Sequence, residues 1–179
     1  MDFKRWSLVF PIFHIALPLI LLEIPYIKKN FQFNRIALII GALLPDIIDK
    51  SLMFLNLGSG RGISHTLLFV VVSFLIVHFF TKRNFLVSIP FFIGCLSHLL
   101  LDLPEVPIFF PFVMYEFIYV DDPLNSWLYS LFNDPVVFFT EISGLFILLF
   151  ILINNQLYSA KKIISFLRNK PFEANKFNS

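Results

Sequence analysis

Six polar residues interrupt or border segments that are otherwise almost entirely apolar, and they are Asp46, Asp49, Arg61, His65, His98 and Asp102. A charged side chain at the centre of a membrane helix costs about 2.5–3.5 kcal/mol on insertion scales, so a polar residue in such a segment favours a functional role. Carboxylates and neutral imidazoles are ligands of zinc and similar divalent ions. The residue types therefore predict a metal site at a membrane surface.

The spacing of these residues supports a shared site. His98 and Asp102 are four residues apart, which puts both on one helical face and lets both reach one ion. Asp46 and Asp49 are three apart and also share a face. Pro45 removes a backbone donor, so we expect the helix to loosen there. The freed carbonyls need new hydrogen-bond partners. A membrane protein tolerates such free carbonyls where the backbone lines a wet cavity.

The composition of the 179 residues is that of a membrane protein with one domain. Hydrophobic residues make up 58% and charged residues 15%, against about 45–50% and about 25% in average soluble domains. The formal net charge of +2 gives no case for nucleic-acid binding. The single Cys95 excludes an internal disulfide and a cysteine-based zinc site.

Five segments meet or approach the length of about 20 apolar residues that a helix needs to cross a bilayer. They are Leu8–Ile27, Ile36–Leu57, Ile63–Phe80, Phe85–Leu103 and Pro135–Ile153. In the second, we interpret Ile36–Ile48 as the membrane part and Ser51–Leu57 as a shallow continuation. The sequence thus predicts an all-α, polytopic membrane helix bundle with about five transmembrane helices.

The segment Pro104–Asp134 is aromatic, Pro-rich and acidic. It predicts a loop with one or two short helices at the membrane interface, with Trp127 and Tyr129 as anchors. Asp134 followed by Pro135 has the pattern of a helix N-cap with proline in the first turn.

Positive residues favour one orientation of these five spans. One side carries ten Lys and Arg residues and the other carries four, and positive residues mark the cytoplasm. We therefore expect the N-terminus outside, residues 1–155 in the membrane, and residues 156–179 as a basic cytoplasmic tail on anionic lipid. Lys4 and Arg5 before an apolar run also fit a signal peptide, but no small-residue cleavage site follows, so we interpret the first segment as a retained helix.

This topology brings polar residues from all five segments to the outer face of the membrane. His14 and Glu141 join the six residues above, whereas His78 falls at the inner end. A random scatter of tolerated polar residues would not converge in this way. A histidine such as His14 can also bond to a neighbouring helix instead of a metal. The candidate metal ligands are His14, Asp46, His65, His98 and Asp102.

Three further candidates have more than one interpretation. Asp49 is a catalytic base or ligand, or it caps the broken helix or pairs with Lys50. Glu141 is a ligand, a base, a partner of a ligand, or a carboxylate that stays protonated at the interface. Arg61 holds an anion through its planar fork, or it extends to the lipid headgroups. No serine-hydrolase elbow, phosphate loop or HExxH motif is present, so nucleophilic serine catalysis has no support.

Three sequence blocks contain most of these residues, and they are Gly41-Ala-Leu-Leu-Pro-Asp46-Ile-Ile-Asp49-Lys50, Arg61-Gly-Ile-Ser-His65-Thr-Leu-Leu and Gly94-Cys-Leu-Ser-His98-Leu-Leu-Leu-Asp102. In this order they resemble the YdjM-like family, whose members are membrane-bound proteins described as metal-dependent hydrolases. The resemblance covers roughly Ile39 to Asp102, and Glu141 in the fifth segment also fits the pattern of the family. The resemblance implies a membrane-bound hydrolase that uses a metal ion.

A more distant likeness is to bacterial zinc-dependent phospholipase C, which is an all-helical enzyme. Its ligand order is His, Asp, His and then His-x-x-x-Asp, which His14, Asp46, His65, His98 and Asp102 repeat. That enzyme is soluble, binds several zinc ions and has further histidine ligands, whereas no histidine follows His98 here. These departures allow at most one well-ligated ion, with or without a weaker second ion beside it.

Together, these observations predict a membrane-bound hydrolase in which a divalent ion, best matched by zinc, activates a water molecule. Asp46, His65, His98 and Asp102 would hold the ion. Asp49 or Glu141 would take the proton, and Arg61 would stabilise an anionic oxygen. The outer-leaflet position favours a lipid or amphiphilic substrate, and the likeness to phospholipase C implies a phosphoester or phosphodiester.

Two non-catalytic functions stay open. The same cluster fits a structural metal site, a polar cluster or an ion pathway, although polar groups on one side alone argue against transport. The protein also fits a lipid-binding or regulatory role in which the basic tail contacts a cytoplasmic partner.

Overall fold

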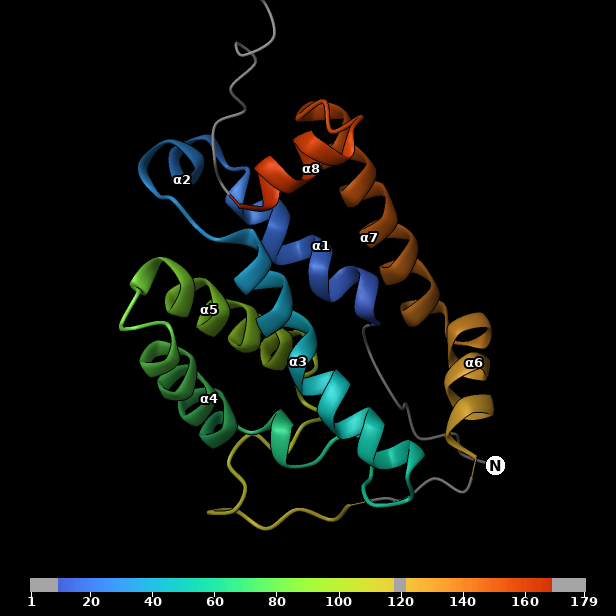
Figure 1. The fold of residues 1–179 in the computed structure, drawn as a ribbon. Helices are drawn as coiled ribbons and strands as arrows, with labels where there is room; N and C mark the ends of the chain where they lie inside the picture. Colours follow the sequence, from blue (N-terminus) through green and yellow to red (C-terminus); the bar gives the residue numbers. More distant parts are fainter. Residues whose placement is uncertain (1–9, 118–121, 169–179) are drawn as a thin grey trace, which may run out of the picture.

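The computed structural model describes residues 10–117 and 122–168, and its regular elements there are all helical (Figure 1). In chain order they are α1 (Pro11–Leu22), α2 (Pro25–Asn30), α3 (Arg35–Phe54), the 3₁₀ turn η1 (Ile63–His65), α4 (Leu67–Phe80), α5 (Phe85–Leu101), α6 (Pro123–Asn133), α7 (Pro135–Asn154) and α8 (Ala160–Leu167). The predicted all-α class is confirmed.

Side chains that accept from backbone N–H groups fix where two helices begin. Thr66 accepts from the N–H of Phe69 at 3.0 Å, so α4 starts directly after η1. Asp134 accepts from the N–H of Val136 at 2.8 Å, and Pro135 occupies the first position of α7. These acceptors satisfy donors that the first helical turn leaves without an intrahelical partner. The predicted N-cap at Asp134 is confirmed.

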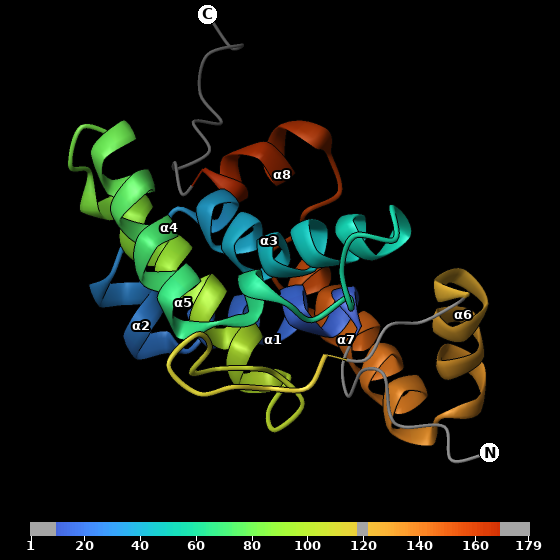
Figure 2. The ribbon, with the colours of Figure 1, turned by 90° about the horizontal axis from the view of Figure 1, so that it is seen from below.

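The larger helices form a row in the order α4, α5, α3, α1 and α7, in which each helix packs against the next (Figures 1 and 2). The turn η1 packs against both α3 and α4. In Figure 1, α8 lies at the top of the row and α6 at the lower right, where it packs against α7. The inner helices of this row, α5, α3 and α1, therefore have neighbours on both sides.

Two glycines let α3 and α5 approach closely. A Cβ atom at Gly41 would lie 2.1 Å from the carbonyl oxygen of Phe91, and one at Gly94 would lie 2.2 Å from a carbonyl oxygen of α3. A larger residue would force the helices apart, as at other small-residue crossings in membrane proteins. Asp46 follows Gly41 on α3, and His98 follows Gly94 by about one turn on α5. The crossing therefore brings these two side chains together.

Two details of the predicted spans are wrong. The segment Leu8–Ile27 is not one helix, because α1 ends at Leu22 and α2 begins at Pro25, whose ring suits a first helical turn. Pro45 does not interrupt the second segment, since α3 runs unbroken from Arg35 to Phe54. The packing of α3 between two neighbouring helices stabilises the helix through the proline.

The described part of the chain has one helix, α7, that is both long and apolar enough to cross a membrane. α1, α4 and α5 are apolar but have 12, 14 and 17 residues, and α3 has 20 residues but carries charged side chains. At 1.5 Å per residue, α1 extends about 18 Å, whereas the hydrocarbon core is about 30 Å thick. The structure thus confirms the helical fold and one candidate span, and it does not confirm a bundle of five spans.

The two predicted peripheral segments both contain a short helix. The segment Pro104–Asp134 holds α6 and, before residue 118, turns without helix. Its Trp127 ring stacks on the Phe10 ring, with centroids 5.0 Å apart. The start of the predicted tail forms α8, which packs against α3. There the Arg35 guanidinium donates to the carbonyl oxygen of Phe166 at 3.1 Å and lies 4.1 Å from the centroid of its ring.

Candidate metal centre

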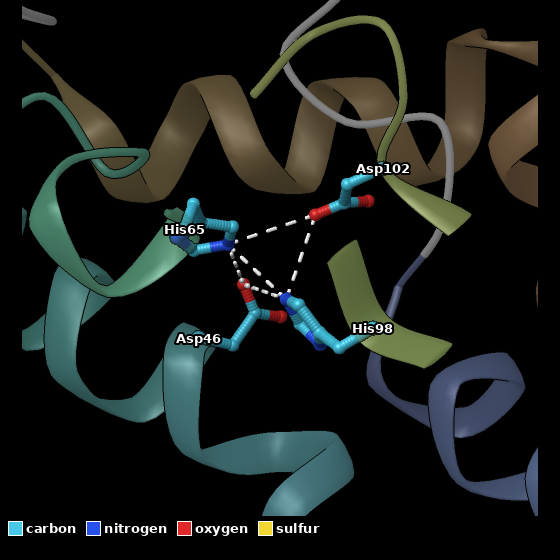
Figure 3. Close-up of side chains that lie close together, drawn as sticks. All are labelled: Asp46, His65, His98 and Asp102. Atoms are coloured by element: carbon cyan, nitrogen blue, oxygen red, sulfur yellow. Dashed lines mark hydrogen bonds and ion pairs between the residues drawn. The ribbon is translucent and has the colours of Figure 1, made fainter. Parts of the chain in front are cut away.

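Four of the predicted ligands gather at one point. Asp46 extends from α3, His65 from η1, and His98 and Asp102 from the end of α5 (Figure 3). One donor atom from each residue lies within 4.8 Å of the other three, and all four residues are buried. This cluster could hold a metal ion.

The distances between the donor atoms fit a small divalent ion. His65 Nε2 and His98 Nε2 are 3.1 Å apart. Asp46 Oδ1 lies 3.5 Å and 3.7 Å from these two nitrogens, and Asp102 Oδ2 lies 3.7 Å and 3.6 Å from them. Zinc bonds of 2.0–2.2 Å in a tetrahedron imply ligand–ligand distances of about 3.3–3.6 Å. These five distances therefore agree with tetrahedral coordination within a few tenths of an ångström.

Hydrogen bonds on the far side of each imidazole fix its tautomer. His65 Nδ1 lies 2.7 Å from Asp49 Oδ2, and His98 Nδ1 lies 2.7 Å from the carbonyl oxygen of Ala42. Both partners only accept, so each Nδ1 carries the proton. A protonated His65 would donate from Nε2 to His98, whereas in neutral rings the lone pairs of the two Nε2 atoms face each other at 3.1 Å and repel. A cation between them removes this repulsion, and both rings are oriented as metal ligands.

Asp49 connects η1 to α3. Its carboxylate accepts from the N–H of Gly62 at 2.6 Å as well as from His65. Ser64 adds a second connection, because its hydroxyl donates to the carbonyl oxygen of Pro45 at 2.8 Å. The predicted catalytic residue Asp49 therefore lies behind the imidazole of His65, where it orients the ring.

Each carboxylate of the cluster has a cation at its second oxygen. Lys50 Nζ lies 2.5 Å from Asp46 Oδ2, and Arg61 Nη2 lies 3.7 Å from Asp102 Oδ1. The Lys50 side chain is 20% exposed and that of Arg61 is 14% exposed, whereas both imidazoles are 0% exposed. The two cations therefore lie on the accessible side of the centre.

His14 and Glu141 lie beside the four-residue cluster. The His14 ring stacks on that of His98 with centroids 4.0 Å apart, and its Nε2 lies 3.4 Å from Asp102 Oδ1. The Glu141 carboxylate accepts from the N–H groups of Ile12 and Phe13 at 3.3 Å and 3.0 Å. Glu141 on α7 thus satisfies two free donors at the start of α1 and holds that helix, which carries His14, in position.

Two groups at the site were not singled out from the sequence as partners of the ligands. The carbonyl oxygen of Ala42, which fixes His98, is main chain and has no signature in residue types. Lys50 pairs with Asp46 rather than with Asp49, and its spacing of four residues from Asp46 could have indicated this contact.

The fold and the cluster define a class of protein, namely an apolar helical bundle with a buried carboxylate–imidazole centre. Residues 11–163 match the YdjM inner membrane protein family, and the protein belongs to this family. The match confirms the resemblance seen in the sequence and includes every candidate site residue from His14 to Glu141. No curated protein and no solved structure matches the chain significantly. The family description places its members in an inner membrane and names no activity.

Proposed function

We propose that this protein is a membrane-bound hydrolase that depends on one zinc ion, held by Asp46, His65, His98 and Asp102. The observation that carries the proposal is the pair of Nε2 atoms that face each other at 3.1 Å with both Nδ1 protons fixed elsewhere. With these protons fixed, both Nε2 atoms are left to face the two carboxylate oxygens and an ion between them, as a metal site requires.

A bound zinc ion supplies an activated water, because it lowers the pKa of that water from 15.7 towards about 7. The residues of the chain have distinct roles around it. Asp49 and the carbonyl of Ala42 orient the two imidazoles, and Lys50 holds the outer oxygen of Asp46. The Arg61 guanidinium lies on the accessible side and stabilises an anionic oxygen of the substrate. The substrate class we propose is a phosphoester or phosphodiester of a lipid or amphiphile, which the family's location in a membrane and the likeness to phospholipase C support.

The corresponding experiment measures metal and turnover in the same samples. The full chain is purified in detergent, its zinc content is determined by elemental analysis, and hydrolysis of a chromogenic phosphomonoester and of a chromogenic phosphodiester is followed with and without chelator. The wild type should contain one zinc and lose turnover with chelator, and His98→Ala should lose both. His78→Ala is the matched control, because His78 is bonded to Ser88 away from the cluster. A wild type without metal would rule out the proposal.

A structural metal site is the second candidate, and the burial of the donors favours it. The side chains of His65 and His98 are 0% exposed, that of Asp102 is 2% exposed and that of Asp46 is 8% exposed. Closed four-ligand sites are typical of structural zinc, whereas catalytic zinc keeps an open position. A protein that contains zinc, loses stability with chelator and hydrolyses neither phosphomonoesters nor phosphodiesters would have this function.

For the membrane arrangement, we propose that α1, α3, α4, α5 and α7 lie in the bilayer, with the N-terminus outside and the C-terminus in the cytoplasm. Large apolar side chains on the surface of these helices support this arrangement, among them Phe79, Phe85 and Phe146, which are 62%, 58% and 65% exposed. A surface of this kind suits lipid rather than water. The test uses a reporter that is active only in the cytoplasm. When it is fused after Ser179 it should be active, and an inactive fusion would refute this orientation.

A further inference from the structure

Four buried polar atoms beside the metal centre lack hydrogen-bond partners, namely Asp102 Oδ1, Arg61 Nη2 and both ring nitrogens of His14, and three of them lie close together. His14 Nε2 and Arg61 Nη2 lie 3.4 Å and 3.7 Å from the third atom, Asp102 Oδ1. Both distances exceed the 2.7–3.2 Å of ordinary N–H···O bonds. Buried polar groups in native proteins are nearly always satisfied, by a ligand or water where the protein supplies no partner. This group of atoms therefore has the character of an incomplete binding site.

The chemistry of the three atoms limits what completes the site. Arg61 carries a permanent positive charge, which disfavours a second metal ion beside Asp102 Oδ1. Arg61 Nη2 is a donor and Asp102 Oδ1 is an acceptor, and His14 Nε2 is a donor in the tautomer that carries its proton on that nitrogen. A fitting ligand thus offers at least one acceptor oxygen, for Arg61 and His14, and one O–H group, for Asp102.

The charge around the centre favours an anion. Three carboxylates, those of Asp46, Asp49 and Asp102, face the side-chain cations of Lys50 and Arg61. A divalent ion on the four donors would add two positive charges beside Arg61, while the Glu141 carboxylate near His14 is bound by the N–H groups of Ile12 and Phe13. Glu105 lies 3.9 Å from Arg61 Nη1, but its side chain is 35% exposed, so solvent screens its charge.

We propose that Arg61 and His14 bind a phosphomonoester group, whose anionic oxygens accept from Arg61 Nη2 and His14 Nε2 and whose P–O–H group donates to Asp102 Oδ1. A phosphodiester has no such proton and would leave Asp102 Oδ1 without a partner. The inference rests on the proposed function, because the ion would add positive charge beside Arg61, and it narrows the substrate class of the same site. The stack of His14 on His98 keeps the His14 ring in place.

The apolar surroundings of Arg61 suit a phosphomonoester attached to a lipid. Leu57 and Ile63 flank it in the chain and are 70% and 59% exposed. A lipid headgroup and free phosphate share the recognised chemistry, so the experiment compares the two sources.

The experiment uses the zinc-loaded full chain in neutral detergent. Isothermal titration calorimetry measures binding of inorganic phosphate, dimethyl phosphate and dihexanoyl phosphatidate. Phosphate should bind, and dimethyl phosphate should bind at least about tenfold more weakly, because a buried acceptor loses its donor. Tighter binding of phosphatidate than of phosphate would assign the site to a lipid, and equal binding would assign it to free phosphate.

Substitutions at the site separate this inference from the metal centre. Arg61→Gln should keep its zinc and weaken phosphate binding by about tenfold to a hundredfold, since a charge-assisted hydrogen bond is lost. Arg83→Gln, in the turn between α4 and α5, is the control and should bind as the wild type does. If Arg61→Gln does not fold, His14→Gln gives the same test through the second donor.

Two results would overturn the inference and leave the zinc centre intact. One is a zinc-loaded wild type that binds dimethyl phosphate as tightly as phosphate. The other is a zinc-loaded Arg61→Gln, or His14→Gln in its place, that binds phosphate as the wild type does. A variant that loses its zinc would also overturn it, because the residue would then be needed to hold Asp102. A wild type that contains no zinc would instead refute the proposed function itself.

Discussion

Replacing Gly94 with alanine tests whether the crossing of α3 and α5 holds the metal centre together. The new Cβ atom would lie 2.2 Å from the carbonyl oxygen of Leu38, so α5 has to move away by about 1 Å to restore ordinary contact. His98 lies one turn further along, and its bond to Ala42 would lengthen from 2.7 Å to about 3.7 Å, beyond hydrogen-bonding range. Overpacking costs about 1–3 kcal/mol, and the lost hydrogen bond costs about 1 kcal/mol more.

Thermal unfolding and zinc competition with a chromophoric chelator, both in detergent, measure the effect of Gly94→Ala. The melting temperature should fall by about 5–15 °C, and zinc affinity should fall about tenfold to a hundredfold because His98 loses its orienting partner. Ser97→Ala is the control, since Ser97 lies on the same helix and the change adds no atoms. Unchanged zinc affinity in Gly94→Ala would refute the argument that this crossing positions His98.

Three further predictions concern the centre and its supports. Asp49→Asn should weaken zinc binding about tenfold to a hundredfold, because the charge behind His65 is lost, and equal weakening by Asp122→Asn would point to a nonspecific effect of charge. Glu141→Ala should destabilise the fold by about 1–2 kcal/mol in thermal unfolding, because two N–H groups of α1 lose their acceptor, while zinc content stays at one ion; loss of zinc would identify Glu141 as a ligand. In protein equilibrated with free zinc at 100 times its Kd, excess chelator should lower the free energy of unfolding by about 2.7 kcal/mol. The same decrease in His98→Ala would show that the ion binds elsewhere.

Residue type and local spacing were sufficient to find the four clustered residues. A carboxylate or imidazole in an apolar segment has few other stable environments, and the four-residue spacing of His98 and Asp102 puts both on one face. The neighbouring blocks of sequence strengthened the same conclusion through the family resemblance, which the match over residues 11–163 confirms.

Contacts between distant segments could not be predicted in the same way. Glu141 accepts from residues 128 and 129 positions away, and nothing in either segment indicates that the two helices meet. The close approach at Gly94 depends on which face of α5 meets α3, which a pattern within one helix does not determine. His14 has the residue type of a ligand, but the position of α1 relative to α5 places its ring parallel to that of His98.

Helix lengths were the weakest part of the prediction. A hydropathy window averages over composition and does not detect where a backbone leaves the helix. Pro25 divides the first apolar segment, and a 3₁₀ turn separates the third from its predicted start. At Pro45 the error was the opposite, because the sequence predicts a loosened helix and the structure has a continuous one. Tertiary packing stabilises α3 through a residue that weakens an isolated helix.

The hydrogen bonds that Asp49 and Ser64 make between α3 and η1 have a consequence for biogenesis. They join Asp46 and His65 into one half of the centre, which the ribosome completes 33 residues before His98. This half has too few donors to retain an ion by itself. An ion bound as proposed could be held by all four ligands only after α5 has been inserted beside α3, and it would then connect the earlier part of the nascent chain to the later part.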